Sequence, residues 1–146
     1  MVCLGNICRS PLAEGILRHK AEASGLEWEI DSAGIGSWHI GKPPFRMSQQ
    51  VALQNGIDIS GQRGRQFQKE DLLKFDRLYF MDKDNYEDAR RIAGNLWDES
   101  KCSLLLAELH PGGRNVPDPY GHPEAEFEKV FGLIDAACDA IVKKYS

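Results

Sequence analysis

The stretch Val2–Pro11, which reads VCLGNICRSP, is the part of the sequence that decides the expected fold. It places a cysteine, Cys3, six positions before an arginine, Arg9. Between them, Gly5 and Asn6 are the residue types that most easily adopt positive φ, so the segment can curl into a tight loop. In such a loop successive backbone N–H groups point inward and bind an anion. The stretch therefore predicts an anion-binding loop that starts directly after a strand.

The residues that follow the loop predict a helix whose amino end faces the same anion. Ser10 is a favourable N-cap and Pro11 is favourable at the first helical position. The positive end of the helix dipole would then reinforce the loop amides. Arg9 adds a planar set of donors suited to two phosphate oxygens. A cysteine at the base of this site, Cys3, would be held as a nucleophilic thiolate.

Length and composition narrow the class of protein. The 146 residues predict a single domain, 1–146, and the net charge of −4 argues against a general nucleic-acid binder. Four cysteines with no CxxC or Cys/His spacing predict neither a disulfide scaffold nor a metal site, and we expect no cofactor. The four histidines form no ligand pattern and are expected at the surface. No apolar run reaches the roughly 18 residues of a membrane span, and no signal peptide is recognised. We expect a cytoplasmic protein, because a working thiolate needs a reducing compartment.

Hydrophobic periodicity predicts alternating strands and helices along the rest of the chain. Strands are expected at 28–33, 76–82 and 101–106, in addition to the one that ends at Cys3, and helices at 10–24, 45–55, 69–75, 84–93 and 123–144. This alternation predicts a three-layer α/β fold, with a twisted, four-stranded parallel sheet covered by helices on both faces. In such sheets ligands bind beyond the carboxyl ends of the strands, where the loop after Cys3 and the loop that carries Trp38 both open.

Five separate motifs make the chain resemble the low-molecular-weight protein tyrosine phosphatases over essentially its whole length. The nucleophile loop of that family is reproduced letter for letter at Val2–Pro11. The other matching segments are Asp31-Ser32-Ala33, Trp38 with Ile40-Gly41 and Pro43-Pro44 behind it, Lys69-Glu70-Asp71, and Asp118-Pro119-Tyr120. Each motif is weak alone, but five in the same order are a specific match.

The resemblance implies hydrolysis of phosphotyrosine through a cysteinyl-phosphate intermediate. Cys3 would be the nucleophile, Arg9 and the loop amides the phosphate clamp, and Asp118 the general acid and then the general base. Asp-Pro is also common in turns, so Asp118 taken alone would be a turn residue. The phosphate-binding residues would be Leu4, Gly5, Asn6, Ile7, Cys8 and Ser10, with Ser32 bracing the loop from behind.

Substrate choice is expected to lie in the walls of the site. Leu4, Ile7, Trp38 and Tyr120 would line a slot for a phosphorylated aromatic ring, and relatives that act on phosphoarginine tend to carry threonine in place of Ile7. The expected partners are a phosphotyrosine-containing protein, by family analogy a bacterial tyrosine autokinase of polysaccharide export, and inorganic phosphate or another oxyanion in the loop. Cys8 has two readings: a small core residue, or a thiol that traps oxidised Cys3 as a disulfide.

Two departures from the family pattern bear on this expectation. The family commonly has a histidine just after the position of Ser60, where it supports the loop asparagine, but Gly61-Gln62 stands here. The family also has several apolar residues before the nucleophile, whereas only Met1 and Val2 precede Cys3. We therefore expect a truncated first strand, with the numbered start lying inside a natural strand. If the chain began here, low stability or a strand donated by a partner chain would follow.

Two other functions compete with the phosphatase. Arsenate reductase shares the loop and the fold but needs two further cysteines close together, and only Cys102 and Cys138 are available. A non-catalytic phosphotyrosine-binding module needs neither a nucleophile nor an acid, so the presence of Cys3, Arg9 and Asp118 argues against it.

Overall fold

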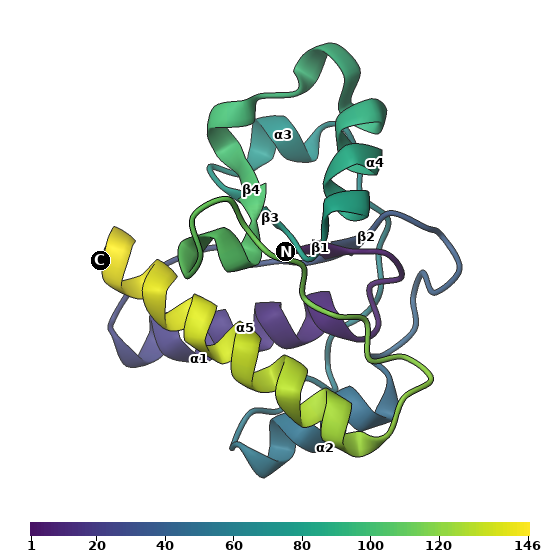
Figure 1. Cartoon of the computed structure of the whole chain (residues 1–146), viewed down its shortest axis with the longest axis vertical. Helices are drawn as coiled ribbons and strands as arrows, with labels where there is room; N and C mark the ends of the chain where they lie inside the picture. Colours follow the sequence, from purple (N-terminus) through teal and green to yellow (C-terminus); the bar gives the residue numbers. More distant parts are fainter.

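Four short parallel strands lie at the centre of the computed structural model, which describes residues 1–146 (Figure 1). The strands are β1 (Val2–Cys3), β2 (Ala33–Gly34), β3 (Leu78–Phe80) and β4 (Cys102–Leu104), in the order β2-β1-β3-β4. All three pairings are parallel. The predicted four-stranded parallel sheet is thus confirmed, with the two-residue strand β1 in a central position.

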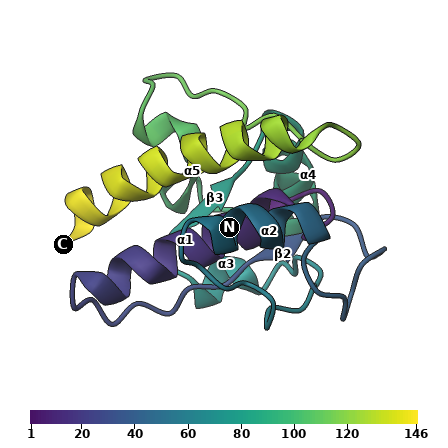
Figure 2. The same ribbon diagram turned by 90° about the horizontal axis from the view of Figure 1, so that it is seen from below.

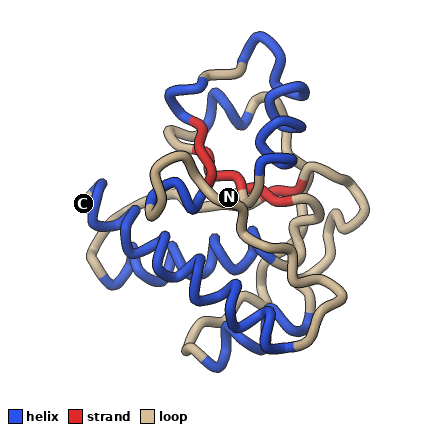
Figure 3. The backbone as a smooth tube through the Cα atoms, viewed as in Figure 1, coloured by secondary structure: helices blue, strands red, loops and turns tan.

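The register of the sheet places the loop after β1 at the middle of its carboxyl edge. Val2 lies opposite both Ala33 and Phe80, and Cys3 lies opposite Gly34. Figure 3 shows the strands as a short central band, with loops leaving it. Starting from β1, the chain adds β2 on one side and then β3 and β4 on the other. Open α/β sheets bind ligands at such a switch in strand order.

Helices cover both faces of this sheet (Figures 1 and 2). The helices are α1 (Arg9–Ala23), α2 (Arg46–Gln54), α3 (Asp71–Lys74), α4 (Lys83–Ala93) and α5 (Glu124–Tyr145), with 3₁₀ turns at Gly94–Leu96, Glu99–Lys101 and Leu105–Glu108. α1 packs against α5, and α2 packs against both of them. α3 and α4 lie on the other face of the sheet. No helix has the length and apolarity needed to cross a bilayer.

Two hydrophobic cores result from this three-layer arrangement. The larger one lies between the sheet and the helices α1, α2 and α5, with Leu12, Phe127 and Ile134 fully buried in it. The smaller one lies under α3 and α4 and is centred on Phe80 and Leu72. Cys138 belongs to the first core and Cys102 to the second, so the sheet separates these two thiols.

The strands are shorter than the apolar runs predicted them to be. The run at 28–33 becomes a strand only at Ala33, opposite Val2 of β1, although the Met1 amino group also donates to the Asp31 carbonyl at 3.1 Å. The run at 76–82 is a strand only at its centre, since Asp82 caps α4 by accepting the N–H of Asn85. The run at 101–106 ends its strand at Leu104 and continues as a 3₁₀ turn. Periodicity alone does not locate these ends, because pairing requires a partner strand.

The first long helix begins one residue earlier than predicted, and by a different device. It starts at Arg9, with Cys8 as the residue before it, and no side chain caps its amino end. The hydroxyl of Ser10, which the sequence predicts as the cap, is directed to the sulfur of Cys3 instead. The prediction of a cap was therefore wrong, because tertiary contacts within the loop claim that hydroxyl.

Candidate active site

Cys3 lies at the carboxyl end of the central strand, and two hydrogen bonds converge on its sulfur. The backbone N–H of Asn6 donates to Sγ at 3.3 Å, and the hydroxyl of Ser10 lies 3.0 Å from Sγ. The Ser10 oxygen also accepts a bond from the Asn6 amide at 2.8 Å. The Ser10 hydroxyl can donate its proton to the sulfur or to the Ala33 carbonyl oxygen, which lies 3.5 Å from Ser10 Oγ. Cys3 itself is buried.

Asn6 holds the loop in its curled form. Its φ of 57° makes it the sole non-glycine residue with positive φ, as expected for an asparagine at a tight turn. Its side-chain amide donates to Ser32 Oγ at 3.0 Å as well as to Ser10. The Ser32 hydroxyl donates in turn to the buried carboxylate of Glu14 at 2.7 Å, which pairs with Arg18. The loop is thus connected through Ser32 to the first turns of α1.

The loop leaves amides free for an anion. The N–H groups of Gly5, Ile7 and Cys8 donate no hydrogen bond within the protein, and they belong to the segment between the thiol and Arg9. A close approach of β2 presses on this segment from one side, since a Cβ at Gly34 would come within 2.9 Å of the Gly5 carbonyl carbon. This is the arrangement of amides that binds phosphate-like groups.

Arg9 is buried and fixed in place by acceptors behind it. Its Nη1 donates to Asp82 Oδ2 at 2.7 Å and to the Val116 carbonyl at 2.9 Å. Its Nη2 lies 3.8 Å from Asp118 Oδ2. The guanidinium is therefore preorganised, with one edge left for an anion in the loop.

Asp118 lies across the mouth of the site from the loop. Its carboxylate is half-exposed, and its Oδ1 accepts the N–H of Tyr120 at 3.1 Å. The turn role and the functional role weighed for this residue are thus both compatible with its position. Asp118, Cys3 and Arg9 line the same pocket of about 210 Å³.

Every residue that lines this pocket except His39 was predicted from the sequence, whereas Asn6 and Ser10, predicted to bind phosphate, are not in the lining. Its lining comprises Cys3, Leu4, Gly5, Ile7, Cys8, Arg9, Trp38, His39, Asp118 and Tyr120. Trp38 and Tyr120 are both more than half exposed, so they form a rim with no protein layer outside it. Phe45 packs edge-on against Tyr120 with ring centroids 5.2 Å apart, which supports that side of the rim.

Cys8 lines the pocket as a protonated thiol. Burial, followed by the negative charges of Cys3 and Asp118, raises its pKa to about 12. All four cysteines are free. A protective Cys3–Cys8 disulfide therefore stays a prediction, to be tested under oxidation.

The sequence reasoning missed two residues of the site. Asp82, which orients Arg9, follows directly after a buried parallel strand, and that position was a usable signal. His39 lies against Gly5, where a Cβ would be 3.2 Å from its Cδ2. His39 is partly exposed, in keeping with the expected surface position, but it also lines the pocket, because the tertiary fold of its loop brings it there.

The support that the family histidine gives to the asparagine comes from another group here. Gln62 turns away and donates to the Pro11 carbonyl at 3.0 Å. The Oδ1 of Asn6 instead accepts the backbone N–H of Arg65 at 3.0 Å. The departure at Gly61-Gln62 therefore leaves Asn6 fully bonded.

A larger cavity, of about 380 Å³, lies elsewhere, and its size does not make it the active site. Its walls include Trp28, Phe75 and Tyr145 but none of the three predicted catalytic residues. The smaller pocket is the one that combines a thiol, a guanidinium and a carboxylate, and we place the site there.

Known proteins resemble this chain in both sequence and fold. Residues 1–145 match the family model described as low molecular weight phosphotyrosine protein phosphatase. YfkJ of Bacillus subtilis, a low molecular weight protein-tyrosine-phosphatase, is 42% identical over 97% of this chain and 90% of its own. Its crystal structure has a TM-score of 0.88 and covers 98% of this chain and 90% of that one.

Two structures of proteins called Wzb show the same fold with small molecules bound. Wzb of Vibrio vulnificus, solved in complex with benzylphosphonate, is 32% identical, with a TM-score of 0.86 and coverage of 98% and 94% of the two chains. Wzb of Escherichia coli, a tyrosine phosphatase solved with sulphate, is 30% identical, with a TM-score of 0.86 and coverage of 99% and 95%. With the family model matched along the chain, these likenesses show that the protein belongs to the low molecular weight phosphotyrosine protein phosphatases.

Proposed function

We propose that this phosphatase hydrolyses protein phosphotyrosine through a cysteinyl-phosphate intermediate formed on Cys3. The observation that carries the proposal is the convergence of Cys3, Arg9 and Asp118 on one pocket, although they come from distant parts of the chain. A nucleophile, a clamp for the equatorial oxygens and a proton donor are what hydrolysis of an aryl phosphate requires.

In the first step the thiolate of Cys3 attacks phosphorus, and the bond from phosphorus to the aryl oxygen breaks. Asp118, in its protonated form, gives its proton to the departing phenolate. Arg9 and the amides of Gly5, Ile7 and Cys8 hold the three equatorial oxygens. In the second step Asp118 accepts a proton from water, the water oxygen attacks phosphorus, and the thiolate leaves with inorganic phosphate as the product. The Ser10 hydroxyl stabilises the thiolate as it departs.

The walls favour an aromatic substrate. Leu4, Ile7, Trp38 and Tyr120 present apolar surface around the phosphate loop. Benzylphosphonate, bound to the Vibrio relative, joins an aromatic ring to a phosphonate group and so supports an aryl phosphate. By the same family analogy we propose a phosphotyrosine-containing protein, such as a bacterial tyrosine autokinase, as the partner. Sulphate on the Escherichia relative supports oxyanion binding in the loop.

The rival functions fit the structure less well. An arsenate reductase would need Cys102 and Cys138 to exchange a disulfide with the site, but they lie in separate cores on the two faces of the sheet. A module that only binds phosphotyrosine would gain nothing from the thiol contacts of Ser10 and Asn6.

The proposal is tested by hydrolysis of two aryl phosphates, one with a good leaving group (p-nitrophenyl phosphate) and one with a poor leaving group (phenyl phosphate). We expect Cys3→Ser to abolish turnover of both. Asp118→Ala should lose about 10²- to 10⁴-fold in kcat on phenyl phosphate and much less on p-nitrophenyl phosphate, because only the poor leaving group needs a proton.

Asp58→Ala is the matched control for the Asp118 variant. Asp58 is exposed and accepts the N–H of Ser60, the same local turn contact that Asp118 makes with Tyr120, but away from the pocket. Its kinetics should equal those of the wild type. Undiminished turnover by Cys3→Ser would defeat the mechanism, and equal losses on both substrates for Asp118→Ala would defeat its role as the acid.

A further inference from the structure

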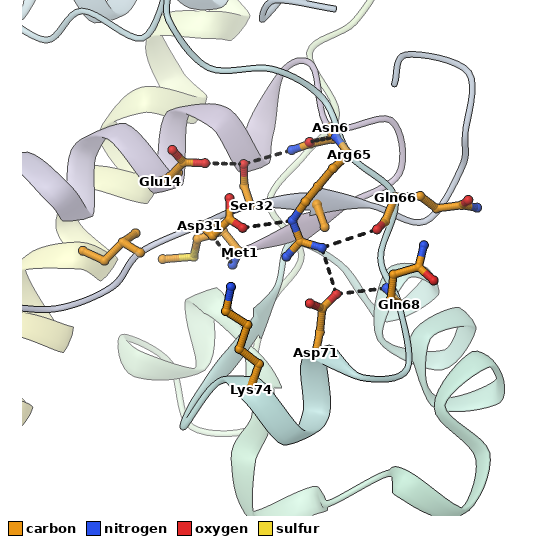
Figure 4. A network of polar contacts seen from close by, with 12 residues as sticks. Met1, Asn6, Glu14, Asp31, Ser32, Arg65, Gln66, Gln68, Asp71 and Lys74 are labelled. Carbon is orange, nitrogen blue, oxygen red and sulfur yellow. Dashed lines mark hydrogen bonds and ion pairs between the residues drawn. The ribbon is translucent and has the colours of Figure 1, made fainter. Parts of the chain in front are cut away.

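The side chain of Arg65 is held between two carboxylates behind the active site (Figure 4). Its Nε donates to Asp31 Oδ2 at 2.9 Å, and its Nη1 donates to Asp71 Oδ2 at 3.0 Å. The Asp71 carboxylate is buried and also accepts the N–H of Gln68 at 2.9 Å. Two anchors on different segments, Asp31 before β2 and Asp71 in α3, therefore fix one guanidinium.

The backbone at Gly64–Arg65 makes four hydrogen bonds to three other segments. The Arg65 N–H donates to Asn6 Oδ1 at 3.0 Å, and the Arg65 carbonyl accepts the N–H of Gly34 at 2.9 Å. The Gly64 N–H donates to the Lys42 carbonyl, and the Gly64 carbonyl accepts the N–H of Gly41, both at 2.8 Å. These two residues thus touch the phosphate loop, the end of β2 and the loop that carries Trp38.

The contact with Asn6 bears directly on the nucleophile. Asn6 has a left-handed backbone conformation, and its own N–H donates to Cys3 Sγ. Strained conformations of this kind persist only where the surroundings over-determine them. Ser10, Ser32 and the Arg65 N–H are the three groups that bond the Asn6 side chain.

The contact with the other loop bears on the walls of the slot. Trp38 folds back over Gly36, where a Cβ would meet its ring at 2.0 Å. At Gly64 a Cβ would lie 2.3 Å from the His39 carbonyl oxygen. The position of Trp38 and His39 is therefore set by how closely their loop approaches Gly64.

We propose that Arg65 is a positioning residue whose anchored side chain fixes the Gly64–Arg65 backbone. Through that backbone it holds the phosphate loop and the Trp38 loop in fixed positions relative to each other. The proposal rests on the proposed function, because it concerns the geometry of the same site. Arg65 touches neither Cys3 nor the pocket. Its effect on catalysis passes through Asn6 on one side and through Gly41 and Lys42 on the other.

The alternative is that Arg65 forms an ordinary structural ion pair. Its side chain is one-third exposed, and partly exposed ion pairs contribute little to stability. A purely structural role therefore predicts a small change in melting temperature and unchanged kinetics once the protein is folded. The positioning role predicts kinetic losses far larger than the change in stability.

The chain offers a matched control two residues away. Arg63 is exposed and donates only to the carbonyls of Ser60 and Gln62, within its own turn. Arg65→Met and Arg63→Met remove the same charge and the same donors from the same segment. We expect Arg65→Met to lose about 10- to 100-fold in kcat/KM on p-nitrophenyl phosphate, the scale of a misplacement of about 1 Å, while Arg63→Met stays within about twofold of the wild type.

One further measurement separates this proposal from the mechanism on which it rests. Binding of inorganic phosphate, followed by calorimetry, should weaken in Arg65→Met and not in Arg63→Met, and this measurement needs no hydrolysis. If the wild type did not hydrolyse aryl phosphates, the proposed function would fail while the phosphate titration still tested the positioning role.

A double-mutant cycle with Asn6→Ala tests the route. If Arg65 acts through Asn6, phosphate binding in the double variant should be little weaker than in Asn6→Ala alone. Fully additive losses, or identical kinetics for Arg65→Met and Arg63→Met, would overturn the proposal. If Arg65→Met does not fold, Arg65→Lys and Arg63→Lys allow the same comparison, because a lysine keeps the charge but lacks the separate Nε and Nη1 donors that bond Asp31 and Asp71.

Discussion

At the scale of single residues, the site depends on places where a side chain would not fit. Gly34 is the clearest of these, because a Cβ there would lie 2.9 Å from the Gly5 carbonyl carbon and 3.0 Å from both the Asn6 nitrogen and its Cβ. The end of β2 therefore presses directly on the phosphate loop. No side chain larger than hydrogen is compatible with that approach.

Gly34→Ala should therefore move the phosphate loop. We expect a loss of about 10²-fold in kcat/KM on an aryl phosphate, since displaced amides no longer match the phosphate oxygens. Gly61→Ala is the control, because a Cβ at Gly61 meets nothing within 4 Å. Steady-state kinetics of both variants, with circular dichroism to verify folding, check the prediction, and equal activity of the two variants would contradict it.

At the scale of elements, helix α1 connects the loop to the main core. It begins at Arg9 and buries Leu12, Ile16 and Leu17 on the side that faces α5. α5 contributes Ile134 and Phe127, both fully buried, to the same core. No side chain caps the amino end of α1. The packing against α5 is therefore what holds this end of the helix under the phosphate site.

Ile134→Ala should lower the free energy of unfolding by about 2–5 kcal/mol, because it leaves a cavity between α5 and α1. Lys129→Ala, on the exposed side of α5, removes only a surface pair with Glu126 and should change it by less than about 0.5 kcal/mol. Urea unfolding of both variants provides the measurement. Similar midpoints for the two variants would show that this interface contributes little.

At the scale of the whole molecule, buried thiols contribute to the response of stability to alkaline pH. Burial raises the pKa of Cys8 and of Cys138 from the ordinary value of 9.0 to about 12, and that of Cys102 to about 11. Above pH 9 these thiols ionise in the unfolded chain but stay protonated in the folded one. The unfolded state then binds fewer protons than the folded state, so stability falls as the pH rises.

The free energy of unfolding should therefore decrease between pH 9 and about pH 11, by up to about 1.4 kcal/mol per pH unit for each of these thiols. Cys138→Ala should reduce the slope by one such contribution. Val130→Ala removes buried volume from the same helix without a titrating group and should keep the wild-type slope. Urea titrations at pH 8, 9.5 and 10.5 test this, and an unchanged slope in Cys138→Ala would refute it.

Much of the fold and of the site was predictable from the sequence, for a local reason. The alternation of apolar runs and amphipathic segments depends on neighbouring residues, so the strand and helix pattern and the parallel sheet followed from it. The loop at Val2–Pro11 contains its own turn residues, its thiol and its guanidinium, which is why Cys3 and Arg9 could be named in advance. Trp38 was placed near the loop by the expected opening of both at one sheet edge, whereas the roles of Asp118 and Tyr120 came from the family resemblance rather than from local pattern.

The rest depended on contacts between segments that are far apart in the sequence. The ends of the strands, the use of the Ser10 hydroxyl and the orientation of Arg9 by Asp82 each require a partner that the local sequence does not identify. The same holds for Arg65, because only the fold places its side chain between Asp31 and Asp71. The sequence by itself determined the chemistry of the loop and the order of the elements, because those are encoded in adjacent residues. Only the tertiary structure decided how that loop is braced, because the groups that bond Asn6 and Arg9 meet only when the sheet is assembled.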